Sequence, residues 1–266
     1  MKRLGERLLA AGGYTAIPNW RLPTYPQANY LRKLFEFAGV TCVLDVGANA
    51  GQFHDFLRNN VGFEGWIISF EPVPHHAKSL RQRALAERKW LCEECALGAK
   101  SGEAEFLVMS NTQFSSFLEP DHSAVGLFES VNRVEQRISV RVDTLDLALA
   151  RLGPDIDKER LYLKMDTQGF DLEVLKGASA TLPHVVALQT EASVKQIYAG
   201  MPDYKSTISC VEALGFELSA IYPNNEGHFP LLVEFDCYLV STRLTRPEGD
   251  VPGGKRPAVA SRPDAT

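Results

Sequence analysis

The chain has 266 residues, of which 45% are apolar and 23% are charged. This is the composition of a globular protein with a sizeable core, and it excludes the membrane, fibrous and wholly disordered classes. With 28 Lys and Arg against 33 Asp and Glu, the net charge is −5. Such a chain offers no basic field for neutralising phosphates, so nucleic acid is not its expected partner.

From about residue 42 the chain alternates short apolar runs with amphipathic stretches, which is typical of βαβ units in a parallel sheet. Near the end, two β-rich runs flank Pro-Asn-Asn-Glu-Gly, and this turn signal predicts a closing hairpin. We therefore expect an α/β fold whose mostly parallel sheet ends in an antiparallel strand. In chain order, the expected elements are a strand at 42–48, a helix after Gly51, a strand at 65–72, a helix at 75–87, strands at 90–98 and 102–109, a strand running into a short helix at 137–149, a strand at 161–169, a helix at 171–179, a strand at 184–193, a helix at 204–215 and the hairpin of 218–223 with 231–240.

Three segments follow from this pattern. Residues 1–30 contain several prolines and aromatic residues, and we expect an irregular arm that packs on the domain, covers a pocket or contributes to a homodimer contact. Residues 31–241 form the folded domain. Residues 242–266 are rich in Pro and Gly and contain no aromatic residue, so we expect a disordered tail.

Five cysteines are an odd number for a disulfide framework, and the Cys92–Cys95 pair has CxxC spacing without a second pair. We expect free thiols rather than a zinc or redox site, and therefore a reducing, cytoplasmic location. The basic start of the chain is interrupted by Gly5 and Glu6, unlike a signal peptide. Because no apolar run approaches about 20 residues, no membrane span is expected.

The strongest local motif is the glycine-rich turn from Asp45 to Gly51, between an apolar strand and a helix. Its glycines permit a tight turn and let a ligand approach the backbone. Glu71 follows at the end of the next strand, where an acid accepts hydrogen bonds from ribose hydroxyls. Asn49 replaces the second glycine of a pyrophosphate loop, and a carboxylate at Asp45 would repel pyrophosphate. The pattern favours S-adenosylmethionine, whose ammonium and sulfonium are positively charged.

A second group of acids stands at the ends of two later strands. Asp166 and Glu191 are expected to face the same crevice, because ligands bind outside the carboxyl ends of parallel strands. Three roles remain open for them: a general base, hydrogen bonds that orient a polyol, or ligands of Mg²⁺. Asp171 and Glu173 are interpreted as the acidic first turn of a helix, and Lys164 as the partner of an acid.

These residues occur in an order that resembles the FkbM family of methyltransferases, over residues 42–241. The resemblance implies the class I methyltransferase fold, which is Rossmann-like with a mostly parallel seven-stranded sheet, and it implies S-adenosylmethionine as the cofactor. The segment 163–178 is the part most specific to the family. The matching motifs are DVGANAGQF, ISFEP, ALG, the pair Ser115-Ser116, VDTLD, LKMDTQGFDLEVLKGA, LQTEAS and EFDCYLV.

The resemblance also assigns residues to the cofactor. The loop is implied to surround the methionine part, Glu71 to bind the ribose, and Ala96-Leu97 to flank the adenine. Gln168 stands where many members carry Glu, so a charge is lost there while the position is kept. The implied cofactor residues are Asp45, Gly47, Ala48, Asn49, Gly51, Gln52, Glu71, Pro72, Ala96, Leu97, Ser115, Ser116 and Gln168.

The expected reaction is O-methylation of a sugar, glycan or polyketide-type small molecule that carries a hydroxyl. Asp166 and Glu191 are the expected catalytic acids and, if Mg²⁺ takes part, its ligands. The pair His75-His76 is an alternative base. Two other functions remain open: an N- or RNA methyltransferase, and a module that binds the cofactor without catalysis. Three segments are candidate walls of the acceptor site, and each is equally consistent with a core patch: the arm with Tyr14, Trp20 and Tyr25, the segment Phe114–Phe128, and Tyr198 through Tyr204.

Overall fold

The computed structural model describes residues 12–14, 17–152, 158–224 and 229–246. Its main sheet has seven strands in the order β3-β2-β1-β7-β8-β10-β9, and only β10 runs antiparallel to its neighbours. This confirms the expected fold class, the class I methyltransferase fold. The strands of this sheet are β1 (Cys42–Val46), β2 (Trp66–Phe70), β3 (Trp90–Glu93), β7 (Leu161–Met165), β8 (Val185–Ser193), β9 (Phe216–Pro223) and β10 (Glu234–Ser241).

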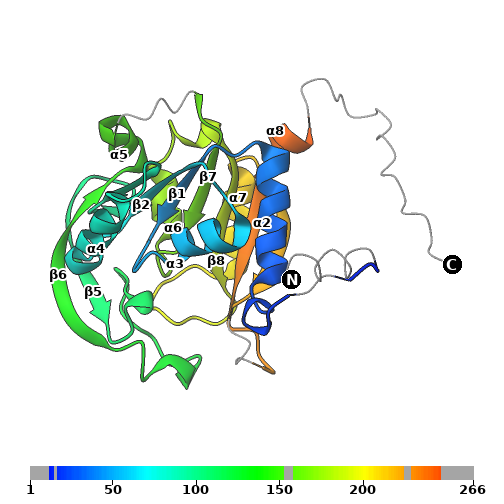
Figure 1. Cartoon of the computed structure of the whole chain (residues 1–266). Coiled ribbons are helices and arrows are strands. Elements are labelled where there is room, and N and C mark those ends of the chain that lie inside the picture. Colours follow the sequence, from blue (N-terminus) through cyan, green and yellow to red (C-terminus); the bar gives the residue numbers. More distant parts are fainter. Residues whose placement is uncertain (1–11, 15–16, 153–157, 225–228, 247–266) are drawn as a thin grey trace.

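Helices cover both faces of the sheet (Figure 1). Successive side chains of β1 point to opposite faces: Val43 packs with α2, α4 and the turn after α3, and Leu44 packs with α5, α6 and α7. Both sides of the central strands are therefore buried, as expected for parallel strands. The helices are α2 (Tyr25–Ala38), α3 (Gln52–Phe56), which continues as the π-helical turn Leu57–Val61, α4 (Pro74–Ala84), α5 (Leu145–Leu152), α6 (Asp171–Lys176) and α7 (Tyr204–Ala213).

A second sheet lies beside the main one, with β6 (Val134–Asp143) between β4 (Ala96–Leu97) and β5 (Gly102–Met109). The prediction of one continuous strand over 90–98 is wrong. Trp90–Glu93 pairs with β2 in the main sheet, whereas Ala96–Leu97 pairs with β6 in the small sheet. The chain thus crosses from one sheet to the other next to Glu71, at the carboxyl end of β2.

Helix α2 begins earlier than the expected irregular arm allows. Pro26 lies in its first turn, where a backbone N–H has no partner within the helix, so proline costs no hydrogen bond there. Gly39 ends the helix in a left-handed conformation with φ of 63°. Its buried Leu31 and Phe35 pack onto the sheet. The expected boundary at residue 30 falls inside this helix. Of the expected tail, residues 242–246 are described, with α8 at Thr242–Thr245, and the remainder lies outside the described residues.

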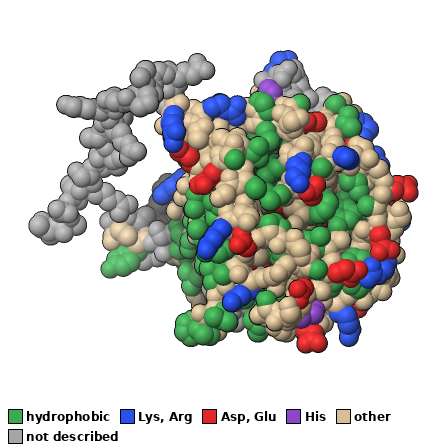
Figure 2. Space-filling model, turned by 180° about the vertical axis from the view of Figure 1, so that it is seen from behind, with side chains coloured by type: hydrophobic (Ala, Val, Ile, Leu, Met, Phe, Trp, Pro, Cys, Tyr) green, Lys and Arg blue, Asp and Glu red, His purple; other side chains and the backbone are tan. Residues whose placement is uncertain are grey.

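Acidic and basic side chains are interspersed on the face of the molecule seen in Figure 2. Among the described helices, none has the length and apolar character needed to cross a membrane. The five cysteines are free thiols, as expected. Burial raises the pKa of both Cys92 and Cys95 to about 12, which keeps these thiols protonated near neutral pH.

Candidate active site

A cavity of about 1370 Å³ runs along the carboxyl ends of β2, β1, β7 and β8. It is closed on one side by the segment between β5 and β6 and on another by the start of α2. Most of the residues predicted from the sequence line it, together with both predicted catalytic acids. Those residues are Gly47, Ala48, Asn49, Gln52, Glu71, Pro72, Ala96, Leu97, Ser115, Asp166, Gln168 and Glu191.

The loop after β1 is held against the neighbouring strands by its backbone. The N–H groups of Gly47 and Ala48 donate to the carbonyl oxygen of Phe70, at 3.0 and 3.1 Å. Gly47 has φ of +77°, and a Cβ atom there would lie 2.1 Å from the carbonyl oxygen of Asp166. Asn49 also has a positive φ, of 46°, which Asn tolerates better than most residues. The loop is therefore fixed between β2 and β7.

Glu71 is almost fully buried at the end of β2, and both of its carboxylate oxygens are engaged. Oε2 accepts the backbone N–H of Asn49 at 2.7 Å, and Oε1 accepts that of Val73 at 2.8 Å. Burial raises the pKa of Glu71 to about 7, although the two backbone hydrogen bonds oppose the shift. Glu71 thus links the glycine-rich loop to the residue after Pro72 and presents a carboxyl group to the cavity.

Lys164 and Asp45 form a buried ion pair beneath the loop. They lie directly opposite each other in the parallel pairing of β7 with β1, with Nζ 3.1 Å from Asp45 Oδ1. The ammonium is also 3.4 Å from Asp166 Oδ2 and donates to the carbonyl oxygen of Gly47 at 3.3 Å. Although burial opposes it, the attraction of Asp45 and Asp166 raises the pKa of Lys164 above its usual value. The expected acid partner of Lys164 is therefore confirmed.

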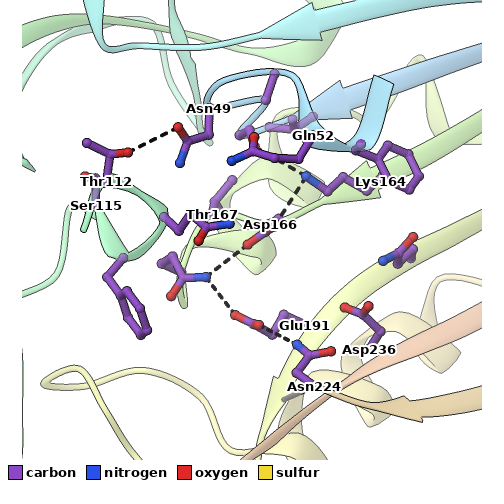
Figure 3. A pocket seen from close by; sticks show the side chains of 18 of the residues that line it. Asn49, Gln52, Thr112, Ser115, Lys164, Asp166, Thr167, Glu191, Asn224 and Asp236 are labelled. Carbon is purple, nitrogen blue, oxygen red and sulfur yellow. Dashed lines mark hydrogen bonds and ion pairs between the residues drawn. The ribbon is translucent and has the colours of Figure 1, made fainter. Parts of the chain in front are cut away.

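The side chain of Gln168 connects the two predicted catalytic acids. In Figure 3, dashed lines run from Asp166 through an unlabelled amide to Glu191, and from Glu191 to Asn224. Gln168 Nε2 donates to Asp166 Oδ1 at 3.0 Å and to Glu191 Oε2 at 2.9 Å. The other oxygen of Glu191 accepts from Asn224 Nδ2 at 2.8 Å. Tyr198 OH lies 3.0 Å from Gln168 Oε1, which fixes the orientation of the amide. An amide at residue 168 can donate to both acids, whereas a carboxylate would repel them.

The proposal that Asp166 and Glu191 hold Mg²⁺ does not fit this arrangement. The NH₂ group of Gln168 stands between the two carboxylates and bonds to both, so their facing oxygens point at a donor rather than at a shared vacant position. Within the described ranges, no group of three or more His, Cys, Asp or Glu side chains is arranged to hold a metal ion.

Three of the predicted cofactor residues do not line the cavity. Asp45 lies behind the wall, paired with Lys164. Gly51 is the N-cap that precedes α3, and a Cβ atom there would lie 2.7 Å from the guanidinium of Arg83. Ser116 is fully buried, and its hydroxyl donates to the carbonyl oxygen of Gln168 at 2.8 Å. These residues shape the wall from behind.

The alternative base, the pair His75-His76, lies at the start of α4, and neither residue is among those that line the cavity. Burial lowers the pKa of His76, which keeps its imidazole neutral at pH 7. Of the segment Phe114–Phe128, the rings of Phe114, Phe117 and Phe128 line the cavity, and its role as a wall of the acceptor site stays a prediction. The residues from the start of α2 that line it are Pro23, Thr24, Pro26 and Gln27.

Two acids of β10 in this site were not predicted from the sequence. Glu234 and Asp236 line the cavity next to Glu191, and burial raises the pKa of each of them to about 7, with further contributions from neighbouring acids. The pKa of Glu191 is raised for the same reasons. The available signal was the pattern Glu-Phe-Asp in an otherwise apolar strand, which places two acids on one face.

The strand order, the glycine-rich loop and the acid at the end of β2 together define a class I methyltransferase. Comparison with known proteins agrees: the model of the methyltransferase FkbM domain matches residues 45–218. The chain therefore belongs to the FkbM family of S-adenosylmethionine-dependent methyltransferases.

Individual relatives are distant. Methyltransferase sdnD from Sordaria araneosa is 29% identical over 157 residues, which are 51% of this chain and 59% of that protein. The crystal structure of an FkbM methyltransferase from Methylobacillus flagellatus aligns with a TM-score of 0.46 at 14% identity, over 75% of this chain and 43% of that one. A magnesium protoporphyrin IX methyltransferase from Synechocystis with bound S-adenosylmethionine aligns with a TM-score of 0.45 at 10% identity, over 85% and 86% of the two chains.

Proposed function

We propose that this chain transfers the methyl group of S-adenosylmethionine to a hydroxyl of a sugar, glycan or polyketide-type small molecule. One observation carries the proposal: a single cavity joins the loop of Gly47 and Asn49, with Glu71 beside it, to the carboxylates of Asp166 and Glu191. The first group suits the cofactor, and the second suits an acceptor with hydroxyl groups, because carboxylates accept hydrogen bonds from them.

The residues present fit the cofactor. Glu71 offers carboxylate lone pairs to the ribose hydroxyls. Gly47 lacks the Cβ that would separate the loop from β7, and Ala96 and Leu97 give the cavity an apolar stretch suited to the adenine. When bound, S-adenosylmethionine supplies a methyl group already activated by the sulfonium. The protein must then align the acceptor oxygen and remove its proton.

The two catalytic acids suit different tasks. Asp166 is partly exposed to the cavity and lies beside the ammonium of Lys164, which suits it to orient a hydroxyl by accepting its hydrogen bond. The pKa of Glu191 is raised by burial and by neighbouring acids, and a carboxylate of higher pKa is the stronger base. With the cofactor held at the loop of Gly47 and Asn49, Asp166 would keep the acceptor oxygen facing the methyl group that the cofactor supplies. The hydroxyl proton passes to Glu191.

The test begins with the cofactor. Calorimetric titration with S-adenosylhomocysteine measures whether the cavity binds the demethylated product, and a methyl-transfer assay then screens hydroxylated sugars, glycans and polyketide-type alcohols. An RNA sample and a set of amine acceptors are screened in parallel. A product carrying a new O-methyl group, located by NMR, supports the proposal. Transfer only to RNA or to nitrogen, or binding without turnover over the whole panel, contradicts it.

A further inference from the structure

The acceptor side of the cavity carries more negative charge than the protein neutralises. Four carboxylates line it in this region: Asp166, Glu191, Glu234 and Asp236. Of the described residues around the cavity, Lys164 is the only Lys, Arg or His. Its ammonium is already paired with Asp45, 3.1 Å away, and with Asp166. Lys164 also attracts Asp236 at longer range, but its ion pairs go to Asp45 and Asp166, and neither Glu191 nor Glu234 has a cationic partner among the described lining residues.

The strand pairing brings these three acids together. Asp236 lies directly opposite Glu191 in the antiparallel pairing of β10 with β8. Glu234 is two residues before Asp236, so both side chains leave the same face of β10, about 7 Å apart along the strand. Like charges in directly opposed positions destabilise a sheet. Acids in such positions are expected where a bound ligand supplies a positive charge that the protein lacks.

The hydrogen bonds of the three acids are unequal. Both oxygens of Glu191 accept bonds from side-chain amides, and Asp236 Oδ2 accepts one from Gln27 Nε2 at 3.1 Å. Glu234 is only 4% exposed, and its buried Oε2 has no hydrogen-bond partner. An unpartnered buried carboxylate oxygen is costly. Because Glu234 lines the cavity, a ligand there could provide the missing donor.

Strand order separates this group from the cofactor residues. Glu71 stands at the end of β2, and the sheet then runs through β1, β7 and β8 to β10. Asp166 directly follows β7, so in the order of the strands it lies between Glu71 and the acids of β10. The positive charges of the cofactor are therefore expected near the loop of β1, and Glu234 and Asp236 remain for the acceptor.

We infer that the methyl acceptor is an amino alcohol, such as an amino sugar, whose protonated amine binds between Glu234 and Asp236 while a neighbouring hydroxyl faces Glu191. The inference rests on the proposed function and names the substrate class of the same site. An ammonium has three donors and no acceptor, which matches a group of carboxylates. The side-chain amides of Gln27 and Asn224 complete a polar wall around it.

The amine is the recognised group and not the methylated one. Carboxylates around an amine favour its protonated form, and a protonated amine has no lone pair with which to attack the methyl carbon. Burial and neighbouring acids raise the pKa of Glu234 and of Asp236 to about 7 each, and Lys164 opposes the shift only at Asp236; an ammonium bound between them would favour their ionised forms. The methyl group is therefore expected on oxygen.

The test uses matched acceptors in the presence of saturating S-adenosylhomocysteine. Methyl glycosides are compared by calorimetry in sets that carry an amine, an N-acetyl group or a hydroxyl at the same carbon. At least one amine is expected to bind at least about tenfold more tightly than its two counterparts, as for a charge-assisted hydrogen bond. Absence of such a preference at every position tested, including absence of binding, overturns the inference.

Two variants of β10 test whether its acids cause the preference for the amine. Glu234→Gln is expected to reduce it at least about tenfold, and Asp236→Asn is the second variant in case the first does not fold. Glu212→Gln, an exposed change on α7 that removes the same charge, is expected to retain it. A preference that survives both cavity substitutions, or a product methylated on nitrogen, overturns the inference. Failure of the proposed function is seen separately, as failure of the wild type to bind S-adenosylhomocysteine.

Discussion

Gly47 and Asp166 are in direct backbone contact, so close that a Cβ atom on Gly47 would lie 2.1 Å from the Asp166 carbonyl oxygen. This contact joins the loop after β1 to the end of β7. It therefore fixes the distance between the residues assigned to the cofactor and the acid assigned to the acceptor. Methyl transfer depends on that distance, because the acceptor oxygen must approach the methyl carbon in line.

Gly47→Ala is expected to destabilise the protein and to weaken binding of S-adenosylhomocysteine, because the backbone of β7 must move to admit the methyl group. Gly62→Ala is the matched control. Gly62 also has a positive φ, of +80°, but nothing lies within 4 Å of its added Cβ. The control carries only the conformational cost, about 1 kcal/mol, and Gly47→Ala an additional 1–3 kcal/mol or so from overpacking. Equal free energies of unfolding for the two variants would show that the contact between Gly47 and Asp166 does not constrain the loop.

Glu71→Gln is expected to weaken binding of S-adenosylhomocysteine by about 1–3 kcal/mol, because charge-assisted hydrogen bonds to the ribose are lost. The amide would also place an NH₂ against the N–H of Asn49 or Val73. The measurement is calorimetry on both proteins, with circular dichroism to show that the variant is folded. Glu64→Gln, an exposed change of the same kind, is the control. Unchanged affinity in the folded Glu71 variant would exclude the ribose role.

The same carboxyl group predicts a pH dependence. The pKa of Glu71 is raised to about 7, so the group is mostly protonated at pH 6 and mostly ionised at pH 8. If the cofactor binds the ionised form, affinity rises with pH by about tenfold over this range and then levels off. Titrations of S-adenosylhomocysteine at several pH values measure it. This increase in affinity with pH should disappear in Glu71→Gln and persist in Glu234→Gln. The reverse result would show that Glu234 on β10 causes it.

The cofactor half of the site could be predicted from the sequence because its signals are local. The turn from Gly47 to Asn49 follows one strand, Glu71 ends the next, and parallel strands bring their carboxyl ends to one edge. Local motifs also misled in part. Ser116 matches a pair near the cofactor, yet its hydroxyl holds the backbone of Gln168, and this function depends on a contact between residues 52 positions apart.

On the side proposed for the acceptor, Asp166 and Glu191 were predicted from the ends of their strands, but the two acids of β10 were not, because pairing distant in sequence brings them there. Glu191 meets Asp236 only through the antiparallel register of β8 with β10, and Gln27 reaches Asp236 across 209 positions. In the sequence, two acids in an apolar strand are equally consistent with a solvated edge. Their burial follows from the packing of α2 over the end of β10, and the early start of α2 was itself missed.

Asp166→Asn and Glu191→Gln are expected to leave the affinity for S-adenosylhomocysteine largely intact and to depress turnover. Loss of a general base costs about 10²- to 10⁴-fold in rate, so Glu191→Gln should lower kcat by that factor. Asp166→Asn, which removes an orienting acceptor, should affect KM as well. Steady-state kinetics on the acceptor identified by the panel measure both. Rates near that of the wild type in both variants would show that neither acid is catalytic.

Glu234→Gln should stabilise the protein at high pH. The pKa of Glu234 is raised in the folded state from its ordinary 4.5 to about 7. The folded protein therefore binds a proton that the unfolded chain releases, and stability falls as pH rises from about 4.5 to 7. The loss reaches about 3 kcal/mol above pH 7. Glutamine resembles the neutral acid and does not ionise, so the variant escapes this loss.

Thermal unfolding from pH 5 to pH 8 measures this effect. The difference in Tm between Glu234→Gln and the wild type should be near zero at pH 5 and positive at pH 8. For the exposed control Glu212→Gln, the difference should stay flat. A saturating cationic ligand should abolish the advantage at pH 8, because it stabilises the ionised Glu234 of the wild type by mass action. If the variant showed no advantage at pH 8 without ligand, Glu234 would not be an uncompensated buried charge.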